Sequence, residues 1–80
     1  MARGTIRYWA AARAAAGTPE EPYEAATVRE ALDAAAAGRG PEFARVVEHS
    51  SLLVDGARAR SETPLADEDV IEVLPPFAGG

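Results

Sequence analysis

The chain has 80 residues, a formal net charge of −5 and no cysteine. A chain of this length forms one domain and buries only about 60% of its unfolded surface. The negative charge argues against nucleic acid and anionic membranes as partners, and it favours basic surfaces of other proteins. Without cysteine there is no disulfide, no thiolate metal ligand and no cysteine nucleophile.

The beginning of the chain and its hydropathy give an expectation about location. Residues 1–4 lead directly into alternating polar and apolar positions, and not into the apolar core of a signal peptide. No segment is apolar for long enough to span a bilayer. We therefore expect a cytoplasmic protein with no membrane partner.

The first predicted element is a strand over residues 5–10 (TIRYWA), which alternate polar and apolar side chains and are rich in strand formers. Arg7 has to face water. Alternation then directs three side chains toward the core: Ile6, Tyr8 and Ala10. It directs Trp9 to the opposite face.

The next two elements are a short helical turn and an edge strand. Residues 11–17 have high helix propensity, with Gly17 as the stop signal. Residues 18–25 contain Pro22, which cannot donate to a strand ladder, so this strand has to lie at an edge of the sheet. Glu20 and Glu21 are expected to be surface charges.

Two helices are predicted in the middle of the chain. Thr27 and Glu30 have the spacing of a capping box, which starts the main helix. The apolar stripe of that helix consists of Val28, Ala31, Leu32, Ala35 and Ala36. Pro41 begins a second short helix, which follows the stop at residues 38–40.

The last third of the chain predicts three strands. Residues 52–54 enter Asp55-Gly56, a strong hairpin signal, and residues 57–60 form the return strand. A turn-rich connector over residues 64–69 leads to the final strand, residues 70–74.

This order of elements predicts an α+β fold of the β-grasp type. We expect a mixed sheet of four to five strands, with the main helix and the second short helix across one face. The first and last strands are expected to be central and parallel. The β-grasp domain spans residues 1–74, and residues 75–80 form a flexible C-terminal tail.

The tail has the properties of a segment that enters another protein. Pro75 and Pro76 have no amide hydrogen, so strand pairing stops there and the chain projects away from the domain. The reach from Pro75 to the terminal carboxylate is at most roughly 20 Å. Gly79 and Gly80 have no Cβ, so they can pass a constriction that excludes side chains. Because the terminal carboxylate can attack the α-phosphate of ATP, we interpret Gly80 as a group that is chemically modified.

The closing residues 74–80 (LPPFAGG) and the preceding residues 65–70 (LADEDV) resemble the MoaD/ThiS family of ubiquitin-like sulfur carrier proteins. The resemblance is closest to the MoaD-like small subunit of molybdopterin synthase, which usually ends in Pro-Pro-x-x-Gly-Gly. Residues 8–13 (YWAAAR) also resemble the family's first strand and the loop after it. Glu68 departs from the pattern, because the family often has glycine between the acidic residues.

The resemblance implies a non-catalytic carrier that binds no cofactor or metal. An E1-like adenylyltransferase would activate Gly80 with ATP, and a sulfurtransferase or another sulfide source would convert it to a thiocarboxylate. The loaded tail would then enter the large subunit of molybdopterin synthase. The residues that would thread into that enzyme are Pro75, Pro76, Phe77, Ala78 and Gly79.

A docking surface is predicted beside the tail. Alternation places an exposed apolar patch on the side of the sheet away from the helices, formed by Trp9, Val70, Leu74 and Phe77. The alternative is that a loop or a second copy of the chain covers Trp9.

Other polar residues receive structural interpretations. The acidic residues 67–69 are expected to be a solvated connection and not a metal site, and His49 is expected to interact with a helix dipole. Ser50 and Ser51 lack the context of a hydrolase nucleophile.

Three alternative functions stay open. The same carrier chemistry could serve thiamin thiazole, cysteine or thio-sugar synthesis. The protein could also be a ubiquitin-like modifier of lysine amines, or a β-grasp interaction module with an inert tail.

Overall fold

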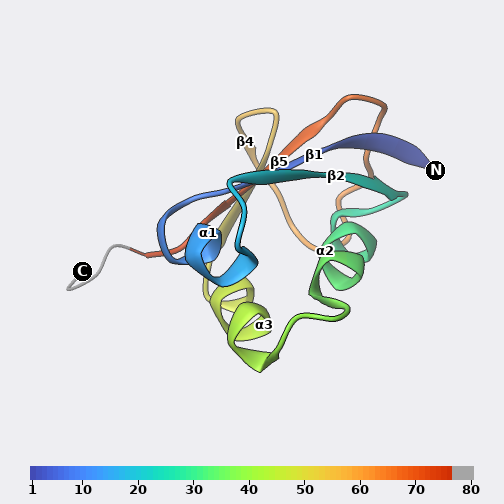
Figure 1. Cartoon of the computed structure of the whole chain (residues 1–80). Helices are drawn as coiled ribbons and strands as arrows, with labels where there is room; N and C mark the ends of the chain where they lie inside the picture. The colour runs from blue at the N-terminus through green and yellow to red at the C-terminus, as the bar shows by residue number, and fades with distance from the viewer. Residues whose placement is uncertain (77–80) are drawn as a thin grey trace.

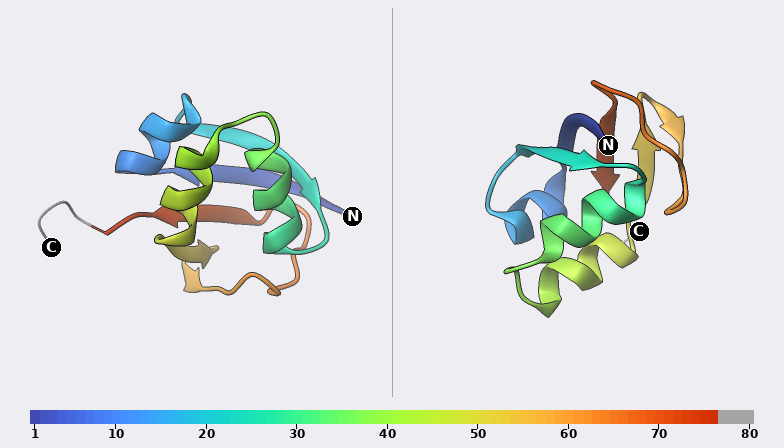
Figure 2. Two further views of the ribbon diagram at one scale, coloured as in Figure 1. Left: turned by 90° about the horizontal axis from the view of Figure 1, so that it is seen from below. Right: turned by 90° about the vertical axis from the view of Figure 1, so that its right-hand side faces the viewer.

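The computed structural model describes residues 1–76. The elements in this part of the chain are β1 (Ala2–Tyr8), α1 (Ala10–Ala16), β2 (Glu20–Ala25), α2 (Val28–Ala36), α3 (Pro41–Glu48), β3 (Ser51–Val54), β4 (Ala57–Arg58) and β5 (Val70–Leu74). The strands form one sheet in the order β2-β1-β5-β3-β4 (Figure 1). The helices lie on one face of the sheet, as Figure 2 shows, and we call the other face the open face. This arrangement is the predicted β-grasp.

The two central strands are β1 and β5, and they run parallel, as the sequence predicts. Ile6 lies opposite Ile71 and Tyr8 lies opposite Val73. All four of these side chains are buried beneath the helices. The outer pairs β1–β2 and β3–β5 are antiparallel, so the sheet is mixed.

The hairpin between β3 and β4 turns at Asp55 and Gly56, whose φ angles are 50° and 83°. Positive φ at both central positions is the property of the type I′ turn that Asp-Gly favours. The return strand is shorter than predicted and ends at Arg58. Arg60 instead enters a turn in which its N–H donates to Thr63 Oγ1 at 2.8 Å.

Helix α2 begins with the predicted cap. Thr27 Oγ1 accepts a hydrogen bond from the Glu30 N–H at 3.3 Å, and Glu30 Oε1 accepts one from the Ala26 N–H at 2.9 Å. These two bonds satisfy donors that a helix start would otherwise leave free. Val28 and Leu32 are buried, as the apolar stripe predicts.

The first strand differs from the prediction at both ends. It begins earlier, at Ala2, because Ala2–Arg7 pair with β2. It ends at Tyr8, and the prediction that Ala10 points into the core is wrong. Ala10 is exposed and has a φ of 49°, because the chain turns there into α1, whose N-cap is Trp9.

A second correction concerns Glu21, which is not a free surface charge. Its carboxylate accepts hydrogen bonds from Tyr8 and, at 2.8 and 3.2 Å, from the two terminal nitrogens of Arg39. Arg39 also donates to the carbonyl oxygens of Ala16 and Ala35, and its guanidinium lies 5.0 Å from the ring centre of Phe43. This cluster ties all three helices to β1 and β2.

Within residues 1–76 no helix has both the length and the apolar character needed to cross a membrane.

Candidate functional site

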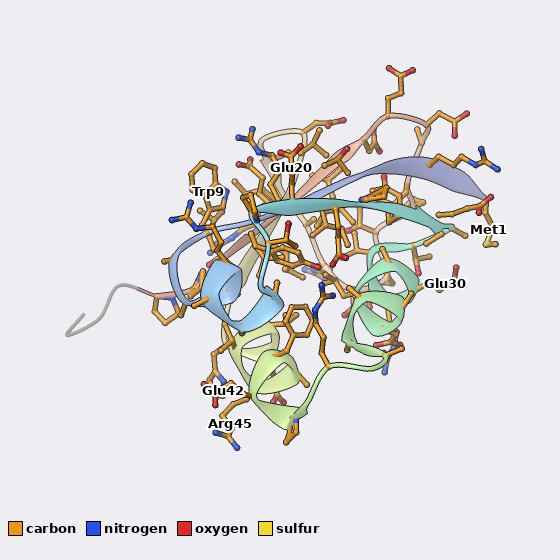
Figure 3. All side chains as sticks on the ribbon, in the orientation of Figure 1. Met1, Trp9, Glu20, Glu30, Glu42 and Arg45 are labelled. Atoms are coloured by element: carbon orange, nitrogen blue, oxygen red, sulfur yellow. The ribbon has the colours of Figure 1, made fainter. Side chains whose placement is uncertain are left out.

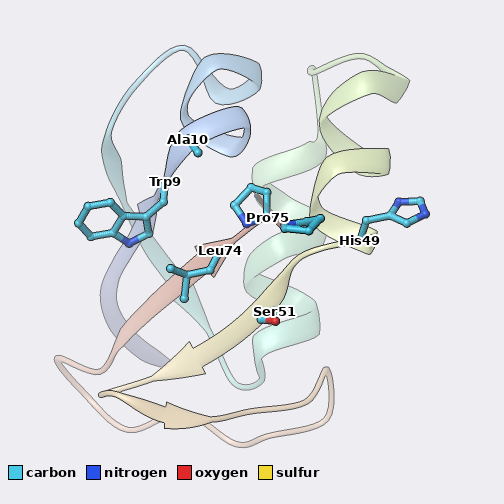
Figure 4. Close-up of a pocket in the computed structure, with 7 residues that line it drawn as sticks. Trp9, Ala10, His49, Ser51, Leu74 and Pro75 are labelled. Carbon is cyan, nitrogen blue, oxygen red and sulfur yellow. The ribbon is translucent and has the colours of Figure 1, made fainter. Parts of the chain in front are cut away.

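The topology brings several chain segments together at one end of the sheet. Because β1 and β5 are parallel, both finish at this end, and the antiparallel β3 begins there. Helix α3 ends just before β3, and α1 starts just after β1. Together these segments form an apolar groove of about 480 Å³, which we call the tail groove (Figure 4). Its lining residues are Trp9, Ala10, His49, Ser51, Leu74, Pro75 and Pro76.

Trp9 forms one wall of the tail groove, and its orientation is fixed. The indole Nε1 donates a hydrogen bond to Glu72 Oε2 at 3.1 Å, and the Arg7 guanidinium lies 5.3 Å from the centre of the ring. The side chain projects from the open face, as Figure 3 shows, and Trp9 is 41% exposed. A tryptophan that is both exposed and ordered is a typical anchor of a protein interface.

The base of the tail forms another wall. The ladder of β5 ends with the pair Ser51–Leu74 and with the hydrogen bond from the Trp9 N–H to the Val73 carbonyl. Pro75 follows directly and is half-buried, whereas Pro76 is exposed. Since neither proline has an N–H, the sheet cannot continue past Leu74.

The predicted docking residues do not all meet at this site. Trp9 and Leu74 lie side by side in the tail groove (Figure 4). Val70 shares the open face with Leu74 but lies at the other end of β5, opposite Thr5, and it does not line the groove. Phe77, Ala78, Gly79 and Gly80 lie outside the described residues, so their roles stay predictions.

Three groove residues were not predicted from the sequence: Ala10, His49 and Ser51. His49 caps α3, and its Nδ1 lies 2.8 Å from the Arg45 carbonyl oxygen. Because a carbonyl only accepts, Nδ1 carries the proton in this contact. The imidazole points away from Pro75 in Figure 4, so the histidine forms part of the groove rim. Ser51 lies beside Leu74 through the register of β3 with β5, a long-range pairing that has no local signal in the sequence.

The acidic connector uses its carboxylates to hold backbone groups. Asp67 Oδ1 accepts a hydrogen bond from the Arg3 N–H at 3.1 Å, and Asp69 Oδ2 accepts one from the Ala66 N–H at 2.9 Å. Among residues 1–76 no group of three or more His, Cys, Asp or Glu side chains is arranged to hold a metal ion. The connector therefore positions the start of β5.

The fold and the site define a class of small ubiquitin-like β-grasp proteins, in which the last central strand leads into a C-terminal tail. The model of the ThiS family matches residues 6–80, and the chain belongs to this family. No curated protein matches the chain in sequence.

Solved structures of the same fold cover nearly the whole chain. Small archaeal modifier protein 1 (SAMP1) from Methanosarcina acetivorans is 30% identical, with a TM-score of 0.86. The TM-score of SAMP1 from Haloferax volcanii is 0.84. The Methanosarcina match covers 100% of this chain and 98% of that one, and the Haloferax match, 26% identical, covers 98% and 99%. A protein assigned as molybdopterin converting factor subunit 1 from Pyrococcus furiosus is 25% identical over 96% of this chain and 100% of that one, with a TM-score of 0.81.

Proposed function

We propose that the protein is a sulfur carrier whose terminal Gly80 cycles between carboxylate, acyl-adenylate and thiocarboxylate. In this proposal the chain is the substrate of an E1-like adenylyltransferase and is not itself a catalyst. It acts in the cytoplasm and delivers its sulfur to a separate acceptor enzyme. The acceptor that we favour is the large subunit of molybdopterin synthase.

The chemistry takes place in two transfers. A carboxylate oxygen of Gly80 attacks the α-phosphorus of ATP, and diphosphate leaves, which gives the acyl-adenylate. A sulfide or persulfide sulfur then attacks the acyl carbon and AMP leaves. If the donor is a persulfide, reduction of the resulting disulfide by a thiol releases the thiocarboxylate. All catalytic groups belong to partner enzymes, and the carrier contributes the terminal acyl group and a surface for recognition.

The observation that carries this proposal is the match of the ThiS family model through residue 80, which includes the Gly-Gly terminus. The geometry supports it, because a central strand leads into Pro75-Pro76 at the edge of an apolar groove. A partner that binds the tail groove would therefore contact the tail at its base. Such binding would direct Gly79-Gly80 toward the partner's active site.

The experiment is an intact-mass measurement after incubation with the adenylating enzyme of the same organism, ATP and a sulfide donor. We expect the mass increase of one oxygen-to-sulfur exchange at the terminus. A chain that lacks Gly80 is the control and should gain no sulfur. An unchanged mass of the full chain, with an enzyme active on another carrier, would overturn the proposal.

A ubiquitin-like modifier is the second candidate, because the 30% identical Methanosarcina protein is described as a modifier. In that case a lysine amine of a target protein attacks the activated Gly80 carbonyl. The chain contains no lysine, so such adducts cannot form on the lysine of another copy. Covalent adducts with other proteins in cells that express a tagged chain would favour the modifier, whereas free thiocarboxylate would favour the carrier.

The acceptor is tested separately. Thiamin thiazole, cysteine and thio-sugar synthesis remain alternative destinations for the same thiocarboxylate. Incubation of the loaded protein with each candidate acceptor enzyme, followed by detection of the sulfur-containing product, distinguishes them.

A further inference from the structure

Two arginines lie beside the tail groove at the β4 edge of the sheet. Arg58 is opposite Leu53 in the β3–β4 register, so it shares the open face with Leu53. The hydrogen bond from the Ala59 N–H to the Leu52 carbonyl keeps the chain beside β3 for one residue more, and Arg60 follows where the chain turns. Arg58 and Arg60 therefore flank β3, the strand whose first residue, Ser51, lines the tail groove.

These arginines differ from most others in the described part of the chain. Four arginines lie within 4.0 Å of a carboxylate: Arg3 with Glu24, Arg7 with Glu20, Arg29 with Asp33 and Arg39 with Glu21. Neither Arg58 nor Arg60 has such a partner among residues 1–76, and both are exposed. Along the chain, the nearest acidic residue to Arg58 is Asp55 and the nearest to Arg60 is Glu62. Neither forms an ion pair with these arginines.

The charges on the open face form a row across all five strands. The register aligns Glu20, Arg7, Glu72, Leu53 and Arg58 in that order. Glu72 therefore has Arg7 on one side and Leu53 on the other. Since neighbouring strands are about 4.8 Å apart, Leu53 separates the Arg58 strand position from that of Glu72 by roughly 10 Å. The β2 side of the face is neutralised, whereas the β4 side keeps its positive charge.

The arginine pair also borders a hollow of about 480 Å³, which is lined only by Arg58, Ala59 and Arg60. The backbone beneath it is fixed from both sides. Ala59 is bonded to β3, and Arg60 exchanges hydrogen bonds with Thr63, through its N–H to Oγ1 and through its carbonyl to the Thr63 N–H. A group that binds in this hollow therefore meets a backbone that is already in place.

We propose that Arg58 and Arg60 form a docking site for a carboxylate-bearing segment of the protein that occupies the tail groove. This inference rests on the proposed function and adds the chemistry of the partner, which is an apolar side chain for the groove and acidic residues for the arginine pair. Charge complementarity favours such a partner, and so does the position of the arginine pair beside β3, which lines the groove at Ser51. In a chain whose net charge is −5, this local positive charge selects acidic partners and orients them.

The test uses the adenylating enzyme of the same organism and measures its KM and kcat for the carrier. We expect the double variant Arg58→Glu, Arg60→Glu to raise KM at least tenfold at low salt while kcat stays within twofold. Salt screens charges at an interface, so the KM of the unchanged carrier should rise with ionic strength more steeply than that of the variant.

The matched control is Arg29→Glu, Arg45→Glu, which has the same net charge but places the new carboxylates on α2 and α3. Its KM should stay within twofold of the unchanged carrier, and both double variants should keep their far-ultraviolet circular dichroism. If both variants raise KM equally, net charge and not the arginine pair controls binding, and the inference fails. An unchanged KM in the Arg58, Arg60 double variant also overturns the inference. If this variant is still adenylated at saturating concentration, the proposed function stays intact.

A third outcome concerns a different partner class. If inorganic polyphosphate shifts the Arg58 and Arg60 side-chain NMR signals at concentrations at which a hexaglutamate peptide does not, the pair is a phosphate site, and the carboxylate proposal is wrong. If the unchanged carrier is not activated at all, the proposed function fails and this inference fails with it.

Discussion

Trp9 and Glu72 are joined across the two central strands by a 3.1 Å hydrogen bond from the indole Nε1 to the carboxylate. The bond lies on the open face at the rim of the tail groove. It holds an exposed aromatic ring in one orientation before any partner arrives. Preorganisation of this kind lowers the entropy cost of binding, which is about 0.5–1.5 kcal/mol for an immobilised side chain.

Glu72→Ala should therefore release the indole without unfolding the protein. We expect larger-amplitude motion of the Trp9 Nε1–H in NMR relaxation and a KM for the adenylating enzyme that is about two- to tenfold higher. Glu24→Ala, which removes an exposed glutamate at the far end of β2, is the control and should change neither. An unaltered order parameter for the indole would show that Glu72 does not hold it.

Trp9→Ala tests whether the ring serves binding or folding. Because Trp9 is 41% exposed, we expect a loss of only about 1 kcal/mol in the free energy of unfolding. The same change should raise the KM of the carrier by tenfold or more, since aromatic anchors contribute strongly to interfaces. Urea unfolding and enzyme kinetics on the same preparation give both quantities, and a stability loss above about 3 kcal/mol would assign Trp9 to the core instead.

Arg39→Ala should be the more damaging change to stability. Its side chain and that of Glu21 are only 23% and 25% exposed. Removal of the guanidinium leaves Tyr8 as the one side-chain donor to the Glu21 carboxylate among the described residues, and it takes a donor from two carbonyl oxygens. We expect a loss of about 2–3 kcal/mol by urea unfolding. Arg3→Ala is the matched control, because the Arg3–Glu24 pair is well exposed and should contribute less than about 1 kcal/mol. Equal losses would mean that the Arg39 cluster adds nothing beyond a surface ion pair.

The same cluster predicts a dependence of stability on pH. Burial alone raises the pKa of Glu21, but hydrogen bonds from Arg39 and Tyr8 and the charge of Arg39 outweigh it, so the pKa lies below its ordinary value. A lowered pKa in the folded state contributes stability above the unfolded value of about 4.3, and this contribution is lost as the pH falls through the folded pKa.

We therefore expect the free energy of unfolding to decrease on acidification from pH 5 to pH 2, with a smaller decrease in Glu21→Gln. If the free energy of unfolding of Glu21→Gln falls with pH as steeply as that of the unchanged protein, other carboxylates control acid stability.

Tyr8 predicts a loss of stability at alkaline pH. Burial raises the pKa of Tyr8, with a further rise from its hydrogen bond to Glu21. The stability that neutral Tyr8 contributes is present below about pH 10 and is lost at higher pH.

Local patterns in the sequence predict much of this fold. The capping box at Thr27, the Asp55-Gly56 turn and the alternation through β5 act over a few residues, and each predicts its element correctly. Alternation fails at Ala10, because the period of a strand cannot indicate where the chain turns into a helix. The resemblance in the tail predicts the family correctly.

Contacts between distant residues could not be predicted in the same way. In the sequence, Arg39 is only one residue of the segment that ends a helix, and nothing nearby indicates its partner Glu21, which is 18 residues away. The site was predicted in part, since Trp9 and Leu74 meet in the groove while Val70 lies apart. His49 and Ser51 join the groove only through the register of β3 with β5.

Gly79 and Gly80 lie outside the described residues, and we expect them to serve activation of the chain and not its stability. The sheet, the core and the tail groove are formed by residues 1–76, so deletion of Gly79 and Gly80 removes no contact of the described fold. We expect the melting temperature of the truncated chain to stay within about 2 °C of the unchanged protein, less than a loss of 1 kcal/mol would cause. Adenylation should be abolished.

Gly79→Val separates the need for a slim terminus from the need for a carboxylate, because it keeps the Gly80 carboxylate but adds a branched side chain next to it. If the terminus has to pass a constriction, this variant should also lose adenylation, measured as ATP–diphosphate exchange. Pro41→Ala, on the first turn of α3 and away from the groove lining, controls for an unrelated change and should be adenylated normally. Normal adenylation of the truncated chain would show that Gly80 is not the acceptor of AMP.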